Sequence, residues 1–366
     1  MEIQNHSSLT PLVDRNGAID FEKSDLLPNP NVTCDVKLLP SPNLTRLVIL
    51  LMAVPVCVAG FGANAINLVV FWHQGFRESV NVSLFSLAFS DMLNLMFLVV
   101  YALVSADLEL GYLHVPPEIW VTCTWIIYSL TLNSCCTAVF ISVERCLCAT
   151  LPFKVKQIIT PCRSAITMAA IFLVCVAATI SPVFSLFGMS WERNPGTNKS
   201  TIVINVHFGN TSPVVYIVTN IVCTSLQVAS FICLLVSTGT LMLALRRKTK
   251  WRLKMTYMIP RTVTNSRETL PSLEKRAGKM VVIVSAVFIV CFAPAQAIPI
   301  TYLSLPEFYY GRRYGYAYGV CWAVSYFLYS VNSSVNLIIY YNMSSRYRDT
   351  LGRLVRQDFS CLHSRK

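Results

Sequence analysis

Charged residues are scarce in this chain. They make up 13% of its 366 residues, against about 25% in a soluble globular protein. Hydrophobic residues make up 54%, and the mean hydropathy is +0.54. So little charge cannot give a chain of this length a water-facing surface, which excludes a soluble enzyme. Intrinsic disorder is excluded too, because so apolar a chain would collapse or enter a bilayer.

Catalytic and cofactor-binding arrangements are also lacking. The fourteen cysteines fall mostly inside apolar stretches and are interpreted as small buried hydrophobes rather than as a disulfide framework. The five histidines are scattered along the chain, at positions 6, 73, 114, 207 and 363. We therefore predict no enzyme activity and no cofactor.

What the chain does have is seven long apolar stretches. A bilayer core about 30 Å thick needs roughly 20 helical residues, and only a helix satisfies its backbone within one spanning segment. Asp91 is the one ionisable side chain deep in them. The sequence thus predicts an all-α membrane protein, a seven-transmembrane helix bundle. Its spans are Leu47–Phe71, Asn81–Ala106, Ile119–Val143, Ser164–Met189, Pro213–Leu245, Met280–Leu303 and Tyr314–Tyr341.

The basic residues indicate which way the spans face. With the N-terminus outside, 22 of the 30 Lys and Arg fall on the cytoplasmic side. The net charge of +12 then reflects topology and attraction to anionic inner-leaflet lipid, not nucleic acid. We predict a multi-pass plasma-membrane protein. The glycosylation sequons on its outer segments are Asn5, Asn31, Asn43, Asn198 and Asn210.

The two ends of the chain differ in character. Residues 1–45 are predicted to be a glycosylated extracellular tail, 46–341 the seven-span domain, and 342–366 a cytoplasmic segment. No apolar stretch precedes Leu47, so the first span is expected to act as the insertion signal. In the last segment Tyr347, Leu351 and Leu354 alternate with arginines, which favours a short amphipathic helix on the membrane surface. Cys361 after it is a palmitoylation candidate, or a free thiol.

Polar motifs inside the spans carry a resemblance. A charge such as Asp91 costs about 2.5–3.5 kcal/mol at the bilayer centre on insertion scales. The motifs are Gly60-Phe61-Gly62-Ala63-Asn64, Asn81-x-x-Leu84-x-x-Leu87-Ala88-x-x-Asp91, Ser142-Val143-Glu144-Arg145-Cys146, Cys291-Phe292-Ala293-Pro294 and Asn332-Ser333-Ser334-Val335-Asn336-Leu337-Ile338-Ile339-Tyr340. Together they resemble the rhodopsin-like G-protein-coupled receptors, from Leu47 to about Phe359. The stretch Ser79-Val80-Asn81-Val82-Ser83-Leu84 is similar to invertebrate neuropeptide-type and chemosensory-type receptors.

The resemblance implies a switch at the cytoplasmic face. Arg145 would pair with Glu144 or with Glu274, holding the third and sixth spans together until the sixth swings out. It would then contact a heterotrimeric G protein, while Tyr340 turns inward. A topological anchor is the alternative role for Arg145.

Two further groups of residues are implied by the same resemblance. Pro294 should kink the sixth span. Phe292, two residues before it, and Phe288, one turn further in, would form an aromatic toggle, with ordinary packing as the alternative. A sodium ion, or a water-linked network with no ion, would be enclosed by five polar residues. They are Asn64, Asp91, Ser134, Asn332 and Asn336.

The sequence departs from the family at several points. Leu337 replaces the usual proline, and Cys146 the usual tyrosine. The outer loop from Gly188 to Ser212 has no cysteine, so the usual disulfide to the third span cannot form. A bridge from Cys34 to Cys123 or Cys321 is the hypothesis that remains.

The ligand is constrained by what the pocket positions hold. Amine receptors carry an aspartate where this chain has Ile127, and without a lysine in the seventh span an opsin is excluded. Outer acids, with Arg312 and Arg313 opposing them, suit a short peptide with a cationic or amidated group, a neuropeptide. The acids suit loop hydration alone equally well. The rim acids are Asp107, Glu109, Glu118, Glu192 and Glu307. The pocket carried over from the family comprises Ile127, Leu130, Thr131, Gln296, Tyr302, Trp322 and Tyr326.

Two other classes stay open at this point. A seven-helix transporter or channel would usually show several intramembrane charges or inverted repeats, and here there is one deep acid and no such repeat. A receptor-shaped protein that does not signal is favoured by the missing disulfide and the altered seventh span. A peptide or small-molecule receptor that couples to a G protein is the function predicted.

Overall fold

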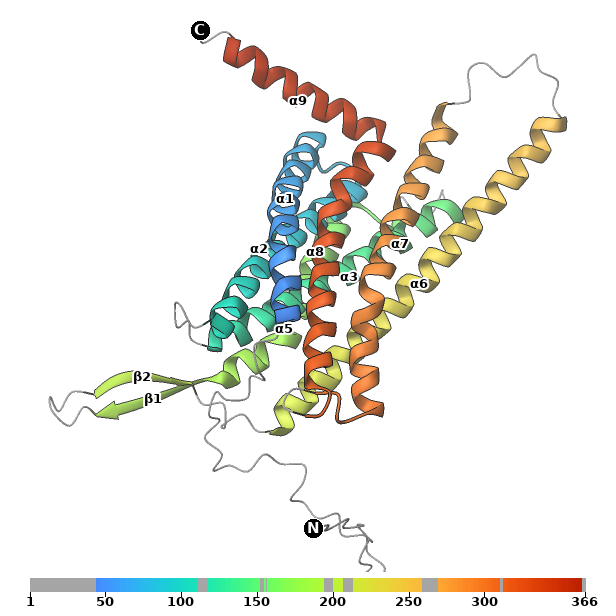
Figure 1. Cartoon of the computed structure of the whole chain (residues 1–366). Coiled ribbons are helices and arrows are strands. Elements are labelled where there is room, and N and C mark those ends of the chain that lie inside the picture. Colours follow the sequence, from blue (N-terminus) through green and yellow to red (C-terminus); the bar gives the residue numbers. More distant parts are fainter. Residues whose placement is uncertain are drawn as a thin grey trace, which may run out of the picture. The chain divides into compact units, whose positions relative to one another are not determined.

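The computed structural model describes residues 44–110, 117–151, 155, 157–193, 200–206, 213–258, 269–309 and 312–363. These residues all belong to one compact unit, Leu38–Lys366. Its elements, labelled as in Figure 1, are α1 (Leu44–Gln74), α2 (Ser79–Leu110), α3 (Pro117–Thr150), α5 (Pro161–Leu186), β1 (Phe187–Arg193), β2 (Ser200–Val206), α6 (Pro213–Met258), α7 (Thr269–Ser304), α8 (Gly315–Met343) and α9 (Ser345–His363). The predicted helical bundle and the amphipathic helix after it are confirmed.

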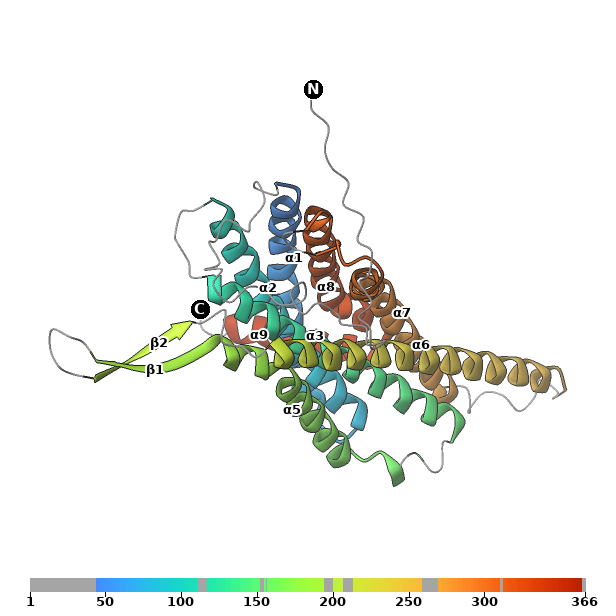
Figure 2. The ribbon, with the colours of Figure 1, turned by 90° about the horizontal axis from the view of Figure 1, so that it is seen from below.

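The bundle is arranged around α3. This helix packs against α2, α5, α6 and α7, whereas α1 packs on α2 and α8. Seen along the bundle, α3 lies in the middle of the other helices (Figure 2). Both α6 and α7 continue past the predicted cytoplasmic ends of their spans, Leu245 and Met280.

Six helices of the described chain are long and apolar enough to cross a membrane. The seventh, α8, is less apolar because tyrosines, serines and asparagines interrupt its sequence. It nevertheless lies between α1 and α7, packed on both. Apolar side chains on the outer faces of other helices are exposed, as Leu173 (66%) and Val290 (69%) illustrate. An exposed apolar belt of this kind suits contact with lipid.

The fourth span ends in a feature that the sequence analysis did not predict. The helix stops at Leu186, not at Met189, and the chain continues as an antiparallel hairpin of β1 and β2. Phe187 pairs with Val206 at one end of this hairpin and Arg193 with Ser200 at the other. The β-branched run 201–204 was the available signal.

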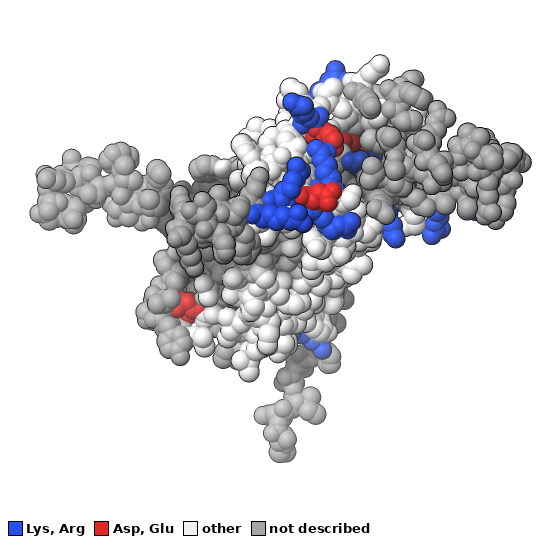
Figure 3. Space-filling model, turned by 90° about the horizontal axis from the view of Figure 1, so that it is seen from above, with Lys and Arg blue, Asp and Glu red and all other residues white. Residues whose placement is uncertain are grey.

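Basic residues gather at the end of the bundle where α9 lies (Figure 3). Exposed members of this group include Arg77, Arg163, Arg246, Arg346 and Arg353. The arrangement agrees with the orientation predicted from the positive-inside rule.

Gly60 lets α1 approach α8 closely. A Cβ atom at this position would clash with Ser334 Oγ and lie 2.9 Å from a methyl of Leu95. Gly62, on a different face of α1, has nothing within 4 Å of the same added atom. We expect Gly60→Ala to lower the stability of the bundle by about 1–3 kcal/mol through overpacking, measured as a fall in the melting temperature of purified protein. Gly62→Ala is the matched control, and an equal fall in both variants would contradict close α1–α8 packing.

Candidate functional site

Asp91 on α2 is fully buried and lies at a junction of three helices. Its Oδ1 accepts hydrogen bonds from Ser134 Oγ (3.1 Å) and Ser333 Oγ (3.0 Å), and its Oδ2 accepts one from Asn336 Nδ2 (2.8 Å). The predicted grouping of Asp91, Ser134 and Asn336 is therefore present. Charge-assisted hydrogen bonds of this kind are the strong ones, so α2, α3 and α8 are tied together inside the bundle.

Asn64 and Asn332 take different places from those predicted. Asn64 does not reach Asp91; its Nδ2 donates to the carbonyl oxygens of Gly60 (3.0 Å) and Ser333 (2.7 Å). Asn332 is buried, with 6% exposed, but it is not one of the three donors to the carboxylate. Ser333 occupies the expected position instead, and links Asn64 to Asp91.

The junction has the chemistry that a hard cation requires. A carboxylate and two serine hydroxyls converge there, and oxygen ligands are those that such ions prefer. The same hydroxyls already satisfy the carboxylate directly, so the network is also complete without an ion. Asp91, Ser134 and Ser333 are the residues that would hold sodium.

An aromatic column runs from α7 into the outer half of the bundle. The rings of Phe288 and Phe292 stack with centroids 3.8 Å apart, and Phe292 lies 4.5 Å from Tyr329 on α8. Tyr329 in turn contacts Tyr326 (6.1 Å). The stack predicted for Phe288 and Phe292 is present, and α7 continues as a helix through Pro294.

The outer end of this column meets the predicted ligand pocket. Tyr326 packs on Trp322 (5.7 Å) and on Tyr101 of α2 (4.7 Å), whose ring stacks on Trp120 of α3 (5.6 Å). On the other side, Tyr302 contacts Tyr309 at 5.2 Å. Of the remaining predicted positions, four are buried on α3 and α7: Ile127, Leu130, Thr131 and Gln296.

A buried cation lies beside these rings. The guanidinium of Arg46, a residue only 7% exposed, lies 5.6 Å from the centre of the Trp120 ring. Trp120 Nε1 donates to Ser105 Oγ at 3.0 Å. The sequence analysis assigned no role to Arg46, Tyr101 or Trp120, because nothing local indicates that α1, α2 and α3 meet there.

The structure describes only some of the charged side chains that were predicted at the rim of the ligand pocket. Asp107 is buried, with 6% exposed, whereas Glu307 and Arg312 are exposed. Arg312 donates to the Pro306 carbonyl (3.2 Å), and Arg313 lies over the Tyr314 ring. The side chains of Glu109, Glu118 and Glu192 lie outside the described part.

The end of α3 that is predicted to be cytoplasmic carries Arg145, whose surroundings differ from the expected ion pair with Glu144. Among the side chains described, Arg145 forms no close salt bridge with Glu144, and its Nε has no hydrogen-bond partner there. Glu144 is 3% exposed and interacts with the Ser79 hydroxyl of α2. Adjacent residues of a helix point in different directions, so Glu144 and Arg145 form no close salt bridge, but their opposite charges still attract each other. Glu274 lies on α7, but its side chain is outside the described part.

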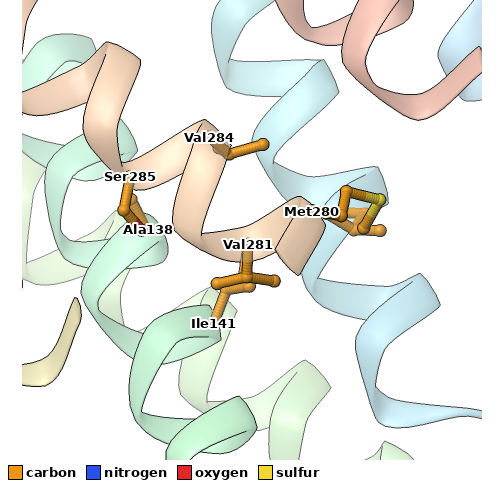
Figure 4. Close-up of a pocket in the computed structure, with 7 residues that line it drawn as sticks. Ala138, Ile141, Met280, Val281, Val284 and Ser285 are labelled. Carbon is orange, nitrogen blue, oxygen red and sulfur yellow. The ribbon is translucent and has the colours of Figure 1, made fainter. Parts of the chain in front are cut away.

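A layer of apolar side chains of α2, α3 and α7 lies between Arg145 and the polar junction at Asp91. A small cavity of about 10 Å³ lies between α2, α3 and α7, with Ile141 of α3 facing Val281 of α7 (Figure 4). This volume is at most that of a single water position. The full lining comprises Leu84, Ala138, Ile141, Met280, Val281, Val284 and Ser285.

Tyr340 lies at the edge of this layer, turned toward α1. It is 1% exposed, and its ring packs against Phe71 (5.4 Å) and against Tyr347 of α9 (5.9 Å). Its hydroxyl has no hydrogen-bond partner in the described chain. A buried hydroxyl left unpaired is costly, so another position of the ring could satisfy it better.

The disulfide hypothesis is not supported. Cys123 and Cys321 are both free thiols; Cys123 is buried, with 4% exposed, and Cys321 is exposed. Cys34 lies outside the described residues, as do the sequons Asn5, Asn31, Asn43, Asn198 and Asn210. Cys361 falls on α9, but its side chain is not described.

Comparison with known proteins agrees with these features. The model of a family described as "7 transmembrane receptor (rhodopsin family)" matches residues 63–340, which is well over half of the chain. A purinoceptor of Xenopus laevis, purinoceptor 4, is 33% identical over 113 residues. That match covers 28% of this chain and 20% of the purinoceptor, so the chain aligns with about a fifth of that relative's length.

Proposed function

Because the chain belongs to the rhodopsin family of seven-transmembrane receptors, we propose that it binds a ligand outside the cell and activates a heterotrimeric G protein inside it. Membership makes it a multi-pass membrane receptor rather than an enzyme or a transporter, and such a receptor needs no cofactor. The observation that carries the proposal is the continuity of α7. Its stack of Phe288 and Phe292 reaches the outer aromatic residues, while its cytoplasmic half closes on α3 near Arg145.

The orientation follows from the charges. With the N-terminus outside and the chain in the plasma membrane, the basic end in Figure 3 faces the cytoplasm and its anionic lipid. The described arginines of α9 lie at this end, as a surface helix requires. The five sequons would then carry glycans on outer segments.

A short peptide is the ligand class we propose. The outer end holds three aromatic side chains, of which Tyr302 is exposed, Trp322 half-buried and Tyr326 buried, and Glu307 is exposed. These groups suit the apolar side chains and the cationic or amidated end of a peptide. A nucleotide is the second candidate, since the relative is by name a purinoceptor and Arg46 places a guanidinium beside Trp120.

A cell-based G-protein activation assay on the full chain tests this function. One arm supplies a library of short peptides with free and amidated ends, and a second arm supplies nucleotides. We expect amidated or cationic peptides to activate. Activation by nucleotides alone would replace the ligand class and leave the receptor function in place. Silence in both arms, with no ligand-free signal from any variant, would instead support a receptor-shaped protein that does not signal.

The polar junction supplies a prediction about ions. We propose that sodium binds at Asp91, with Ser134 and Ser333, and stabilises the resting receptor. Asp91→Asn should keep the fold, because an amide can still accept from both serines, yet it loses the charge that attracts the cation. Agonist binding should therefore respond to sodium in the unmutated protein and not in the variant. If the unmutated protein ignores sodium, the network functions without an ion.

A further inference from the structure

A line of hydrogen bonds joins the amphipathic helix to the intramembrane acid. The Tyr347 hydroxyl of α9 donates to Asn67 Oδ1 at 2.6 Å, and Asn67 Nδ2 donates to Asn64 Oδ1 at 3.3 Å. Asn64 Nδ2 donates to the Ser333 carbonyl at 2.7 Å, and Ser333 Oγ donates to Asp91 Oδ1 at 3.0 Å. The line thus passes from α9 through α1 and α8 to α2.

Every member of this line is buried. Asn64, Asn67 and Asp91 have no exposed surface, and Tyr347 and Ser333 are 1% and 2% exposed. Each donor lies on the α9 side of its acceptor, so all four bonds have the same direction and end on the carboxylate. The two asparagine amides pass polarisation from one hydrogen bond to the next. At Ser333 the line continues from the backbone carbonyl to the side-chain hydroxyl through saturated carbon, so there the coupling depends on the position of the residue. Burial also raises the pKa of the Tyr347 phenol, which keeps it protonated as the donor.

The side chain of Tyr347 on α9 reaches into the bundle. Its ring contacts Phe71 (5.7 Å) and Tyr340 (5.9 Å), and its hydroxyl reaches Asn67. These contacts place one side chain of α9 against both α1 and α8.

Arg346, the residue before Tyr347, connects α9 to the turn between α1 and α2 by an ion pair and a hydrogen bond. Arg346 pairs with Glu78 at 2.6 Å and donates to the Gln74 carbonyl at 3.2 Å, and both charged side chains are exposed. Exposed pairs contribute little because water screens them. Tyr347 is therefore the buried polar contact of α9 with α1, and Leu351 and Leu354 add apolar packing against the cluster that contains its ring.

We propose that the Tyr347 hydroxyl is a positioning group that couples the seating of α9 on α1 to the charge state of Asp91. Neutralisation of the carboxylate, or cation binding to it, changes its hydrogen bond from Ser333 and so the position of that residue. The change reaches Tyr347 through the hydrogen bonds of Asn64 and Asn67. By reciprocity, loosening α9 changes the environment of Asp91. Tyr340 packs on the Tyr347 ring, so the coupling reaches the cytoplasmic face beside the proposed switch. The inference rests on the proposed function only for that last step.

Hydrogen–deuterium exchange on the full chain in lipid nanodiscs tests the coupling. The backbone amides of Arg348, Asp349 and Thr350 report on the seat of α9. Asp91→Asn weakens the last bond of the line, since an amide accepts less strongly than a carboxylate. We expect it to speed their exchange about fivefold, the lower end of typical site-to-site coupling. Tyr347→Phe, which keeps the ring and loses the hydroxyl, should speed it as well.

The double variant decides between a coupled line and two separate effects. In a coupled line, Asp91→Asn adds nothing once Tyr347→Phe is present, whereas independent effects would multiply. Tyr341→Phe, at a residue with 49% exposed, is the matched control and should leave exchange unchanged.

Two results would overturn the proposal: multiplied effects in the double variant, or exchange in Asp91→Asn equal to that of the unmutated protein. The second decides the matter even if Tyr347→Phe fails to fold. No ligand, sodium or G protein enters this experiment, so its failure leaves the receptor function standing, and a silent ligand screen leaves the coupling standing.

Discussion

Glu274→Gln should raise signalling in the absence of ligand, and Arg145→Ala should abolish coupling while agonist still binds. Arg145 stands at the cytoplasmic end of α3 without a partner for its Nε among the described residues, and it does not pair with Glu144. Glu274 on α7 is then the acid proposed to restrain it. A pair partly buried between helices that contributes about 1.4 kcal/mol shifts a two-state equilibrium tenfold.

The two variants must diverge for this account to hold. Glu274→Gln removes only the restraint, whereas Arg145→Ala also removes the group proposed to contact the G protein. Arg77→Ala, which removes an exposed arginine at the same end of the bundle, is the control for lost charge and should leave signalling unchanged. If both switch variants merely reduce surface expression, with signalling per receptor unchanged, Arg145 is a topological anchor.

Phe288→Leu should reduce the maximal response to agonist several-fold with little change in agonist affinity. The ring of Phe288 stacks on Phe292 at 3.8 Å and 14°, and Phe292 passes the contact to Tyr329. Leucine retains much of the apolar volume but loses the flat face. A ring contact of this kind contributes about 0.5–1.5 kcal/mol, which corresponds to roughly a two- to thirteenfold change in equilibrium.

The matched control is Val290→Ala on the same helix. Val290 is 69% exposed on the outer face of the bundle, so its truncation should leave the response unaltered. If Phe288 serves only in packing, Phe288→Leu should lower the melting temperature and leave the response per receptor unchanged. Dose–response curves normalised to surface receptor distinguish the two roles.

The helices and three of the four residues of the polar junction could be predicted because both depend on local pattern. Charge-free runs of about 25 residues indicate spans, and motif spacing places Asp91, Ser134 and Asn336 on inward faces. The predicted set omits Ser333, although this residue precedes Asn336 by three positions and so shares its helix face. The predicted close pair of Arg145 with Glu144 is only a longer-range attraction in the structure, because successive helix positions point in different directions.

Contacts between distant segments could not be predicted in the same way. Tyr347 and Asn67 lie 280 positions apart, and their bond depends on where α9 folds back, which no local pattern records. The same holds for the meeting of Arg46 with Trp120. By position along the chain Cys123 suits an outer bridge, but burial against neighbouring helices decides its state, and only the packed bundle gives that.

Nucleotide exchange on purified heterotrimeric G proteins tests the central claim most directly, because it needs no known ligand. The receptor is reconstituted in nanodiscs as the unmutated chain, as Glu274→Gln, and as Glu274→Gln combined with Arg145→Ala. The account predicts that Glu274→Gln accelerates exchange about tenfold on at least one G-protein class, and that adding Arg145→Ala returns it to the rate without receptor. Folded receptor that leaves exchange unchanged in all three forms, on every class, would contradict it.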